Sequence, residues 1–166
     1  MGFQSIKPKV LEAGVMVIKR ILWPTDFSVN SEKALPYLES LTKQYNAQVH
    51  VLYVIQEIPH PMAWYGDSGE MHIDELIKQA KNSAKKRLDQ ICEHNMGGDF
   101  FYAKHIALGD PAREILAFIK ARKMDQVVMA TRGEKGHFQF GSVCEKVMKN
   151  SPVPVTAIPI FPDIAA

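Results

Sequence analysis

Apolar segments of strand length alternate with amphipathic segments of helical length along most of this chain, and no other feature constrains its fold as strongly. The pattern predicts strands at residues 21–23, 48–55, 100–106, 126–130 and 153–160. It predicts helices at about residues 30–45, 73–94 and 111–123, and a last helix that begins at Ser142 and ends before Pro152. Strands that alternate with helices form parallel sheets through right-handed crossovers. We therefore expect an α/β fold, an open doubly wound five-stranded parallel sheet of the Rossmann-like type, with helices on both faces.

The composition is that of an ordinary globular domain, and it argues against several classes of protein. A net charge of +2 over 166 residues is too small to indicate binding to nucleic acid or to an anionic membrane. No apolar run reaches transmembrane length. Cys92 and Cys144 lack the spacing of a redox motif, which favours a reducing compartment, so a cytoplasmic location is predicted. We expect residues 1–17 to form a tail or an accessory strand, and residues 18–166 to form one domain.

The residues that follow the expected strands are the first candidates for a binding site. In open parallel sheets, ligands bind beyond the carboxyl ends of the strands, where the strand order reverses. Four segments occupy such ends, namely Pro24 to Asp26, Val54 to Ile55, Leu108 to Asp110, and Ala130 to Gly133. Asp26 is the best-placed acid among them. Its carboxylate could accept hydrogen bonds from a ribose or a base edge, or it could simply begin a turn.

A glycine-rich loop links the strand at 126–130 to the last helix. Glycines at positions 133, 136 and 141 would let the backbone approach an anion closely, and the first N–H groups of the helix would point at it. The loop region carries the basic residues Arg132, Lys135 and Lys146. Ser142 and Glu145 have the spacing of a capping box, so Ser142 is expected to cap the helix, to bind phosphate, or to do both.

Two other kinds of site are not supported by the pattern. His137 and Cys144 could suggest a nucleophile, but no acid-base partner is identifiable beside them. The remaining histidines have no metal-ligand spacing. His50 and His105 fall in expected strands and are interpreted as packed or surface residues, so no metal site is predicted.

The motifs ILWPTDFS, VLYVIQ, GDPAREIL and MATRG followed by FGSVCEKVMKNSPVPV resemble the universal stress protein family. The resemblance extends from Ile18 to Ile160 and implies an adenine-nucleotide α-hydrolase-like fold. In nucleotide-binding members a loop of the form G-x2-G-x9-G-[ST] holds ATP. Here Ala130 stands where the first glycine is expected, and seven residues separate Gly133 from Gly141. An alanine is tolerated there only if the position does not require a positive φ angle.

Carried over by position, the resemblance implies a complete nucleotide site. Adenine and ribose would be flanked by Pro24, Thr25 and Asp26. The base would also contact Val54. Ribose and phosphate would be lined by the end of the strand and the loop after it: Met129, Ala130, Arg132 and Gly133. The phosphates would be received by the start of the helix: Gly141, Ser142, Val143 and Cys144.

These residues lead to one functional expectation and one alternative. We expect a cytoplasmic stress-response protein that binds ATP or AMP, with Mg²⁺ held by the phosphates, and acts as a sensor or regulator with little turnover. The alternative is a nucleotide-free interaction module. In either case the resemblance implies a homodimer formed through the last strand, whose prolines suit a sheet edge. An enzyme of the wider α-hydrolase-like group is disfavoured, because neither a serine-glycine-glycine loop nor a His-Ile-Gly-His motif occurs.

Overall fold

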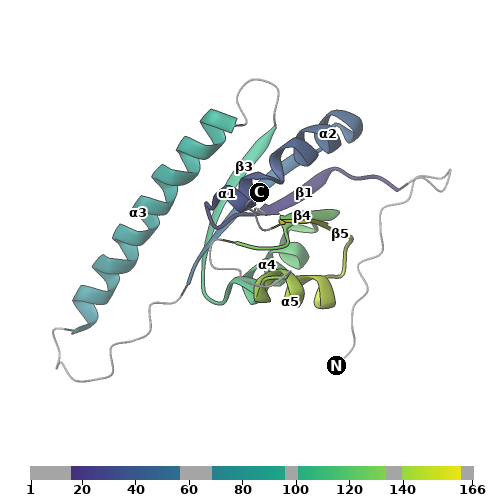
Figure 1. Ribbon diagram of the computed structural model, residues 1–166. Helices are drawn as coiled ribbons and strands as arrows, with labels where there is room; N and C mark the ends of the chain where they lie inside the picture. Colours follow the sequence, from purple (N-terminus) through teal and green to yellow (C-terminus); the bar gives the residue numbers. More distant parts are fainter. Residues whose placement is uncertain (1–15, 57–68, 96–100, 134–139, 162–166) are drawn as a thin grey trace, which may run out of the picture.

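The structure is a computed structural model that describes residues 16–56, 69–95, 101–133 and 140–161 (Figure 1). Five strands and five helices follow one another within these residues. In chain order they are β1 (Arg20–Pro24), α1 (Val29–Glu32), α2 (Leu35–Tyr45), β2 (Gln48–Ile55), α3 (Gly69–Asn95), β3 (Tyr102–Leu108), α4 (Pro111–Arg122), β4 (Gln126–Ala130), α5 (Ser142–Asn150) and β5 (Val155–Ile158). None of the helices in the described part of the chain is both long enough and apolar enough to cross a membrane.

The strands form one parallel sheet in the order β3-β2-β1-β4-β5, which confirms the expected doubly wound fold. Strand β1 lies in the middle of the sheet, where Leu22 is paired with His50 of β2 on one side and with Val127 of β4 on the other. The chain therefore builds the sheet outward in one direction through β2 and β3, and then in the other through β4 and β5. The reversal between β1 and β4 is the topological switch point, where a ligand site is expected.

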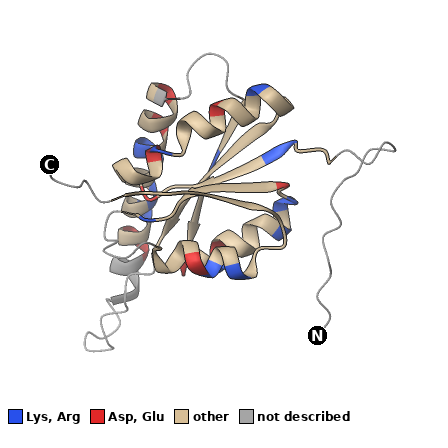
Figure 2. Cartoon of the chain, turned by 45° about the vertical axis from the view of Figure 1, so that its right-hand side comes forward, with Lys and Arg blue, Asp and Glu red and all other residues tan. Residues whose placement is uncertain are grey.

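Alternate residues of the central strands face two separate hydrophobic cores. Ile21 and Trp23 of β1 are fully buried and pack on the side of α2 and α3. Leu22, between them, is fully buried on the side of α4 and α5. Each such side chain contributes about 1.5–3 kcal/mol by leaving water. The lysine, arginine, aspartate and glutamate residues lie mainly on the outer helices, of which some cover each face of the sheet (Figure 2).

Several element boundaries differ from the sequence-based expectation. The helix expected at 30–45 is two helices, α1 and α2, and Pro36 is the second residue of α2, where its missing N–H breaks no helical hydrogen bond. Strand β3 begins two residues later than expected. Strand β5 is shorter than expected, since it lies between Pro154 and Pro159. The expected tail at 1–17 falls almost entirely outside the described residues, as do Gly97 and Gly98.

His50 and His105 form a contact pair beneath α4. Nδ1 of His50 lies 3.0 Å from Nε2 of His105, and the two rings are stacked with an interplanar angle of 7°. Phe118 of α4 packs against the ring of His105, with 4.7 Å between centroids. His50 is 8% exposed, and its Nε2 atom has no hydrogen-bond partner. The interpretation of these histidines as packed residues is confirmed by their position.

Candidate functional site

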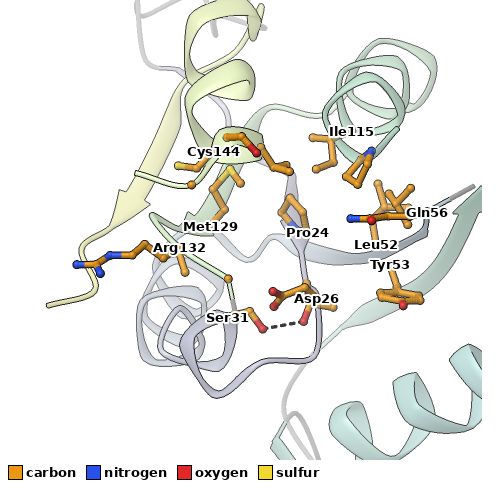
Figure 3. Close-up of a pocket in the computed structure, with 18 of the residues that line it drawn as sticks. Pro24, Asp26, Ser31, Leu52, Tyr53, Gln56, Ile115, Met129, Arg132 and Cys144 are labelled. Atoms are coloured by element: carbon orange, nitrogen blue, oxygen red, sulfur yellow. Dashed lines mark hydrogen bonds between the residues drawn. The ribbon is translucent and has the colours of Figure 1, made fainter. Parts of the chain in front are cut away.

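A cavity of about 650 Å³ opens at the carboxyl ends of β1, β2 and β4 (Figure 3). Its volume lies in the range of small-molecule sites. The N-terminal residues of α4 and α5 complete its wall. All twelve site residues predicted from the sequence line this cavity, namely Pro24, Thr25, Asp26, Val54, Met129, Ala130, Arg132, Gly133, Gly141, Ser142, Val143 and Cys144. The fold thus brings together at the switch point residues that are far apart in the chain.

The turn after β1 is held by a compact set of hydrogen bonds. The backbone N–H of Thr25 donates to the carbonyl of Leu52 over 3.0 Å. The Thr25 hydroxyl lies 2.9 Å from that of Ser31, the contact shown as a dashed line in Figure 3. Asp26 accepts from the backbone N–H of Ser28 over 3.1 Å and also from its hydroxyl. Asp26 is exposed and lines the cavity, so it begins a turn and its carboxylate is accessible from the cavity.

Gly133 passes so close to Asp26 that any side chain at this position would have to displace the Asp26 carboxylate. A Cβ atom built on Gly133 would lie 2.1 Å from Oδ2 of Asp26, far inside van der Waals contact. The side-chain amide of Asn30 donates to the Gly133 carbonyl over 3.1 Å and ties α1 to this loop. The sequence predicted close approach of this glycine to an anion. In the structure, the group it approaches closely is the carboxylate of the site itself.

Helix α5 begins at Ser142 as expected, but Gly141 rather than Ser142 is its N-cap residue. Gly141 has extended backbone angles, φ −73° and ψ 150°, and its carbonyl accepts from the N–H of Glu145 over 3.0 Å. Ser142 is therefore the first helical residue, and the capping box predicted from Ser142 and Glu145 is wrong. The serine and the glutamate have the right spacing, but they lie one position too far along the helix. The N–H groups of Ser142, Val143 and Cys144 have no partner within the helix and lie at the cavity.

This correction changes what alanine substitutions should do to stability. Ser142→Ala is expected to leave the melting temperature almost unchanged, because no side-chain cap is lost. Asp110→Ala is the matched case, since Asp110 caps α4 by accepting from the N–H of Arg113 over 2.9 Å. It should cost about 1 kcal/mol. Thermal unfolding of the two variants, followed by circular dichroism, checks the difference, and a comparable loss in Ser142→Ala would contradict the cap assignment.

Two residues in the loop region show how the site departs from the family pattern. Ala130 is the last residue of β4 and has strand conformation, so its methyl group causes no backbone strain. Arg132 lines the cavity, but its guanidinium group points away from it (Figure 3). Nη2 of Arg132 donates to the carbonyl of Ile160 over 2.6 Å. The predicted position of Arg132 is correct, whereas its charge is directed to the segment after β5. Lys135, Gly136 and His137 lie outside the described residues.

Cys144 is buried at the start of α5. Burial raises the pKa of its thiol to about 11, so the thiolate is scarce near neutral pH. The thiol lies 3.8 Å from the sulfur of Met148, one turn further along α5. Among the residues that the structure describes, no group of three or more His, Cys, Asp or Glu side chains is placed to hold a metal ion.

The structure adds lining residues that the sequence-based prediction did not include. They lie on β2 or directly after it, on α1 and at the start of α4: Leu52, Tyr53, Gln56, Ser31, Pro111 and Ile115. The first two precede Val54 on the same strand, and the GDP motif before α4 indicated that this helix begins at the rim. The position of the Tyr53 ring could not be predicted from the sequence, because the ring is held at the cavity by stacking on the ring of Phe27, with 4.2 Å between the centroids.

Comparison with known proteins assigns the chain to a family. Residues 18–159 match the model of the universal stress protein family, and the chain belongs to this family. It is 31% identical over 151 residues to universal stress protein MJ0531 of Methanocaldococcus jannaschii, covering 90% of this chain and 86% of the relative.

Solved structures show the same architecture. Hypothetical protein MJ0577, from the same archaeon, superposes with a TM-score of 0.78 at 27% identity, covering 89% of this chain and 100% of that one. A universal stress protein in complex with cAMP has a TM-score of 0.54 at 17% identity, covering 86% of this chain and 97% of that one. This second likeness concerns the fold alone.

Proposed function

We propose that this universal stress protein binds an adenine nucleotide, ATP or AMP, in the cavity at the switch point and acts as a cytoplasmic sensor or regulator. One observation carries the proposal: the apolar side chains of Val54 and Met129, the carboxylate of Asp26 and the N-terminus of α5 all line one cavity. A related protein is known in complex with cAMP, itself an adenine nucleotide. The cavity volume is sufficient for a ligand of that size.

Each part of the nucleotide has a chemically suited partner in the cavity. Val54 and Met129 provide apolar surface for the base. Asp26 offers its carboxylate to the ribose hydroxyl groups. The free N–H groups at the start of α5 and the positive end of that helix suit the phosphates. With ATP, Mg²⁺ would be held by the phosphates. The proposed role is binding with little turnover.

Equilibrium titration of the purified protein with ATP, ADP and AMP tests this proposal. Binding of at least one adenine nucleotide is expected, with GTP as the control for the base. The small molecules released from protein that was purified without added nucleotide should also show the ultraviolet absorbance of adenine. No detectable binding at millimolar nucleotide would overturn the proposal, and the alternative, a nucleotide-free interaction module, would then be favoured.

We also propose a homodimer that forms through β5. This strand lies at the edge of the sheet and pairs with β4 on one side. Phe161, three residues after β5, is 75% exposed. An exposed edge strand is a liability unless another strand covers it. An antiparallel β5 from a second copy would satisfy its outward backbone groups and close the assembly with twofold symmetry.

Ala157→Pro is expected to convert the dimer into a monomer. The carbonyls of Pro154 and Ile158 accept from β4, so the even-numbered residues of β5 pair inward and the N–H of Ala157 points outward. Proline removes that N–H group without disturbing β4. Light scattering across a concentration series should show the mass fall to 18.7 kDa, that of one chain. Ala157→Ser keeps the N–H group and should remain dimeric. A wild-type protein that is monomeric throughout would refute the dimer.

A further inference from the structure

Phe27, the residue directly after Asp26, has an unusual backbone conformation. Its φ angle is +63°, in the left-handed region that bulky side chains rarely adopt. Two other non-glycine residues of the described chain, Asn46 and Lys123, have positive φ, and both are helix C-caps, where this conformation is common. Phe27 is no helix cap and is buried, with 6% exposure. A conformation of this kind persists only where surrounding contacts maintain it.

Contacts from three elements hold Phe27. Its N–H donates to the hydroxyl of Thr25 over 3.0 Å. Its ring stacks on Tyr53 of β2 with an interplanar angle of 30°. Arg87 of α3 makes two contacts with it. The guanidinium carbon lies over the ring, 5.0 Å from its centroid, and Nη2 donates to the Phe27 carbonyl over 3.3 Å. Arg87 of α3 thus contacts both the ring and the backbone carbonyl of Phe27.

The geometry of Phe27 determines where Asp26 points. The N–H of Ser28 reaches Oδ1 of Asp26 because the chain turns sharply at Phe27. If Phe27 relaxed to an extended conformation, this N–H group would swing away from the carboxylate. Asp26 would then lose the hydrogen bonds that hold it beside Gly133 at the cavity.

Helix α3 is attached to the body of the protein by its second half. Its buried residues are Ala84, Leu88, Ile91 and Cys92, and the last three belong to the hydrophobic core on that face of the sheet. From Asp74 to Ser83 no side chain of the helix is buried, and this half extends away from the sheet (Figure 1). Arg87 lies within the attached half, so its contacts with Phe27 depend on the docking of α3 against the sheet.

We propose that Arg87 is a positioning residue for the cavity, which makes nucleotide affinity depend on the docking of α3. Arg87 does not line the cavity, and it acts through Phe27 on Asp26. The proposal rests on the proposed nucleotide binding. It predicts a coupling between Arg87 and Phe27 that a merely stabilising surface arginine would not show.

Nucleotide titration of a double-mutant cycle tests this coupling. Arg87→Ala should weaken nucleotide binding by about fivefold. Glycine adopts positive φ without strain, so in a Phe27→Gly background the same Arg87→Ala change should have less than about a twofold effect. Lys86→Ala, an exposed change one residue earlier on α3, should leave affinity unchanged. Equal losses in both backgrounds, or no loss in either, would overturn the proposal. If Phe27→Gly fails to fold, Phe27→Asn replaces it, because asparagine tolerates the left-handed region.

A ligand-free measurement separates this proposal from the proposed function. Hydrogen exchange of the backbone amides in residues 26–31 should be faster in Arg87→Ala than in wild type and in Lys86→Ala. Unchanged exchange would overturn the role of Arg87 even if nucleotide binds normally. Faster exchange in Arg87→Ala, combined with a wild-type protein that binds no nucleotide, would uphold the positioning role and reject the proposed function alone.

Discussion

Gly133→Val is expected to weaken adenine-nucleotide binding by roughly tenfold or more, which corresponds to losing one hydrogen bond to a charged group. The added Cβ atom would lie 2.1 Å from Oδ2 of Asp26 and must displace that carboxylate from the cavity. The fold should survive, since Gly133 lies in a loop and Asp26 is exposed. Calorimetric titration of the variant, together with its melting temperature, measures both effects.

Gly141→Ala is the matched control for this experiment. A Cβ atom on Gly141 would meet the Thr131 carbonyl at 3.5 Å, an ordinary contact, and its φ of −73° suits any residue. Alanine at this position should therefore leave the fold and the Asp26 carboxylate undisturbed, so that any loss of affinity would come from the phosphate end of the site and not from Asp26. A folded Gly133→Val protein with wild-type affinity would remove Asp26 and Gly133 from the site.

Acid is expected to destabilise the protein through His50, by about 2 kcal/mol between pH 7 and pH 4. The pKa of His50 is lowered from 6.5 to about 4, chiefly by burial and to a lesser extent by the charges of His105, Arg20 and Arg122. The pKa of His105 is also lowered, chiefly by burial. The folded protein keeps His50 neutral where the unfolded chain already binds a proton. The stabilisation is therefore complete above pH 6.5 and is lost as the pH falls towards 4.

Urea unfolding at pH 7, 5.5 and 4.5 measures this dependence. His50→Leu should flatten it, because the titrating group is removed. His94→Gln is the control, since His94 is exposed on α3 and its replacement should leave the acid sensitivity intact. An unchanged pH dependence in His50→Leu would show that other groups carry the acid response.

The sequence predicted the fold and the rim of the cavity because both depend on local patterns. Short apolar runs ending at Pro24, Ile55 and Ala130 marked the strand ends, and parallel topology brings such ends to one edge. The site residues named from those ends line the cavity that the structure contains. Their roles in binding remain a prediction.

What the sequence missed depends on contacts between distant segments. The cap of α5 was placed one residue too late, because the spacing of Ser142 and Glu145 does not reveal which residue has extended backbone angles. The direction of the Arg132 side chain is decided by the carbonyl of Ile160, which the loop pattern cannot show. The pairing of His50 with His105 depends on the register of β2 and β3. No periodicity within one strand contains that information.

The central position of β1 has a consequence for how the protein is made. Its second neighbour, β4, is synthesised much later, and the hydrogen bond from Lys19 to Asp125 joins residues 106 positions apart. Until β4 has left the ribosome, β1 has one open edge, and no nascent chain can contain the whole cavity. Such distant pairing is a slow step in folding, because a long loop must close before the contacts form. A nucleotide bound in this cavity would therefore favour only completed chains and could not assist the folding of the first half.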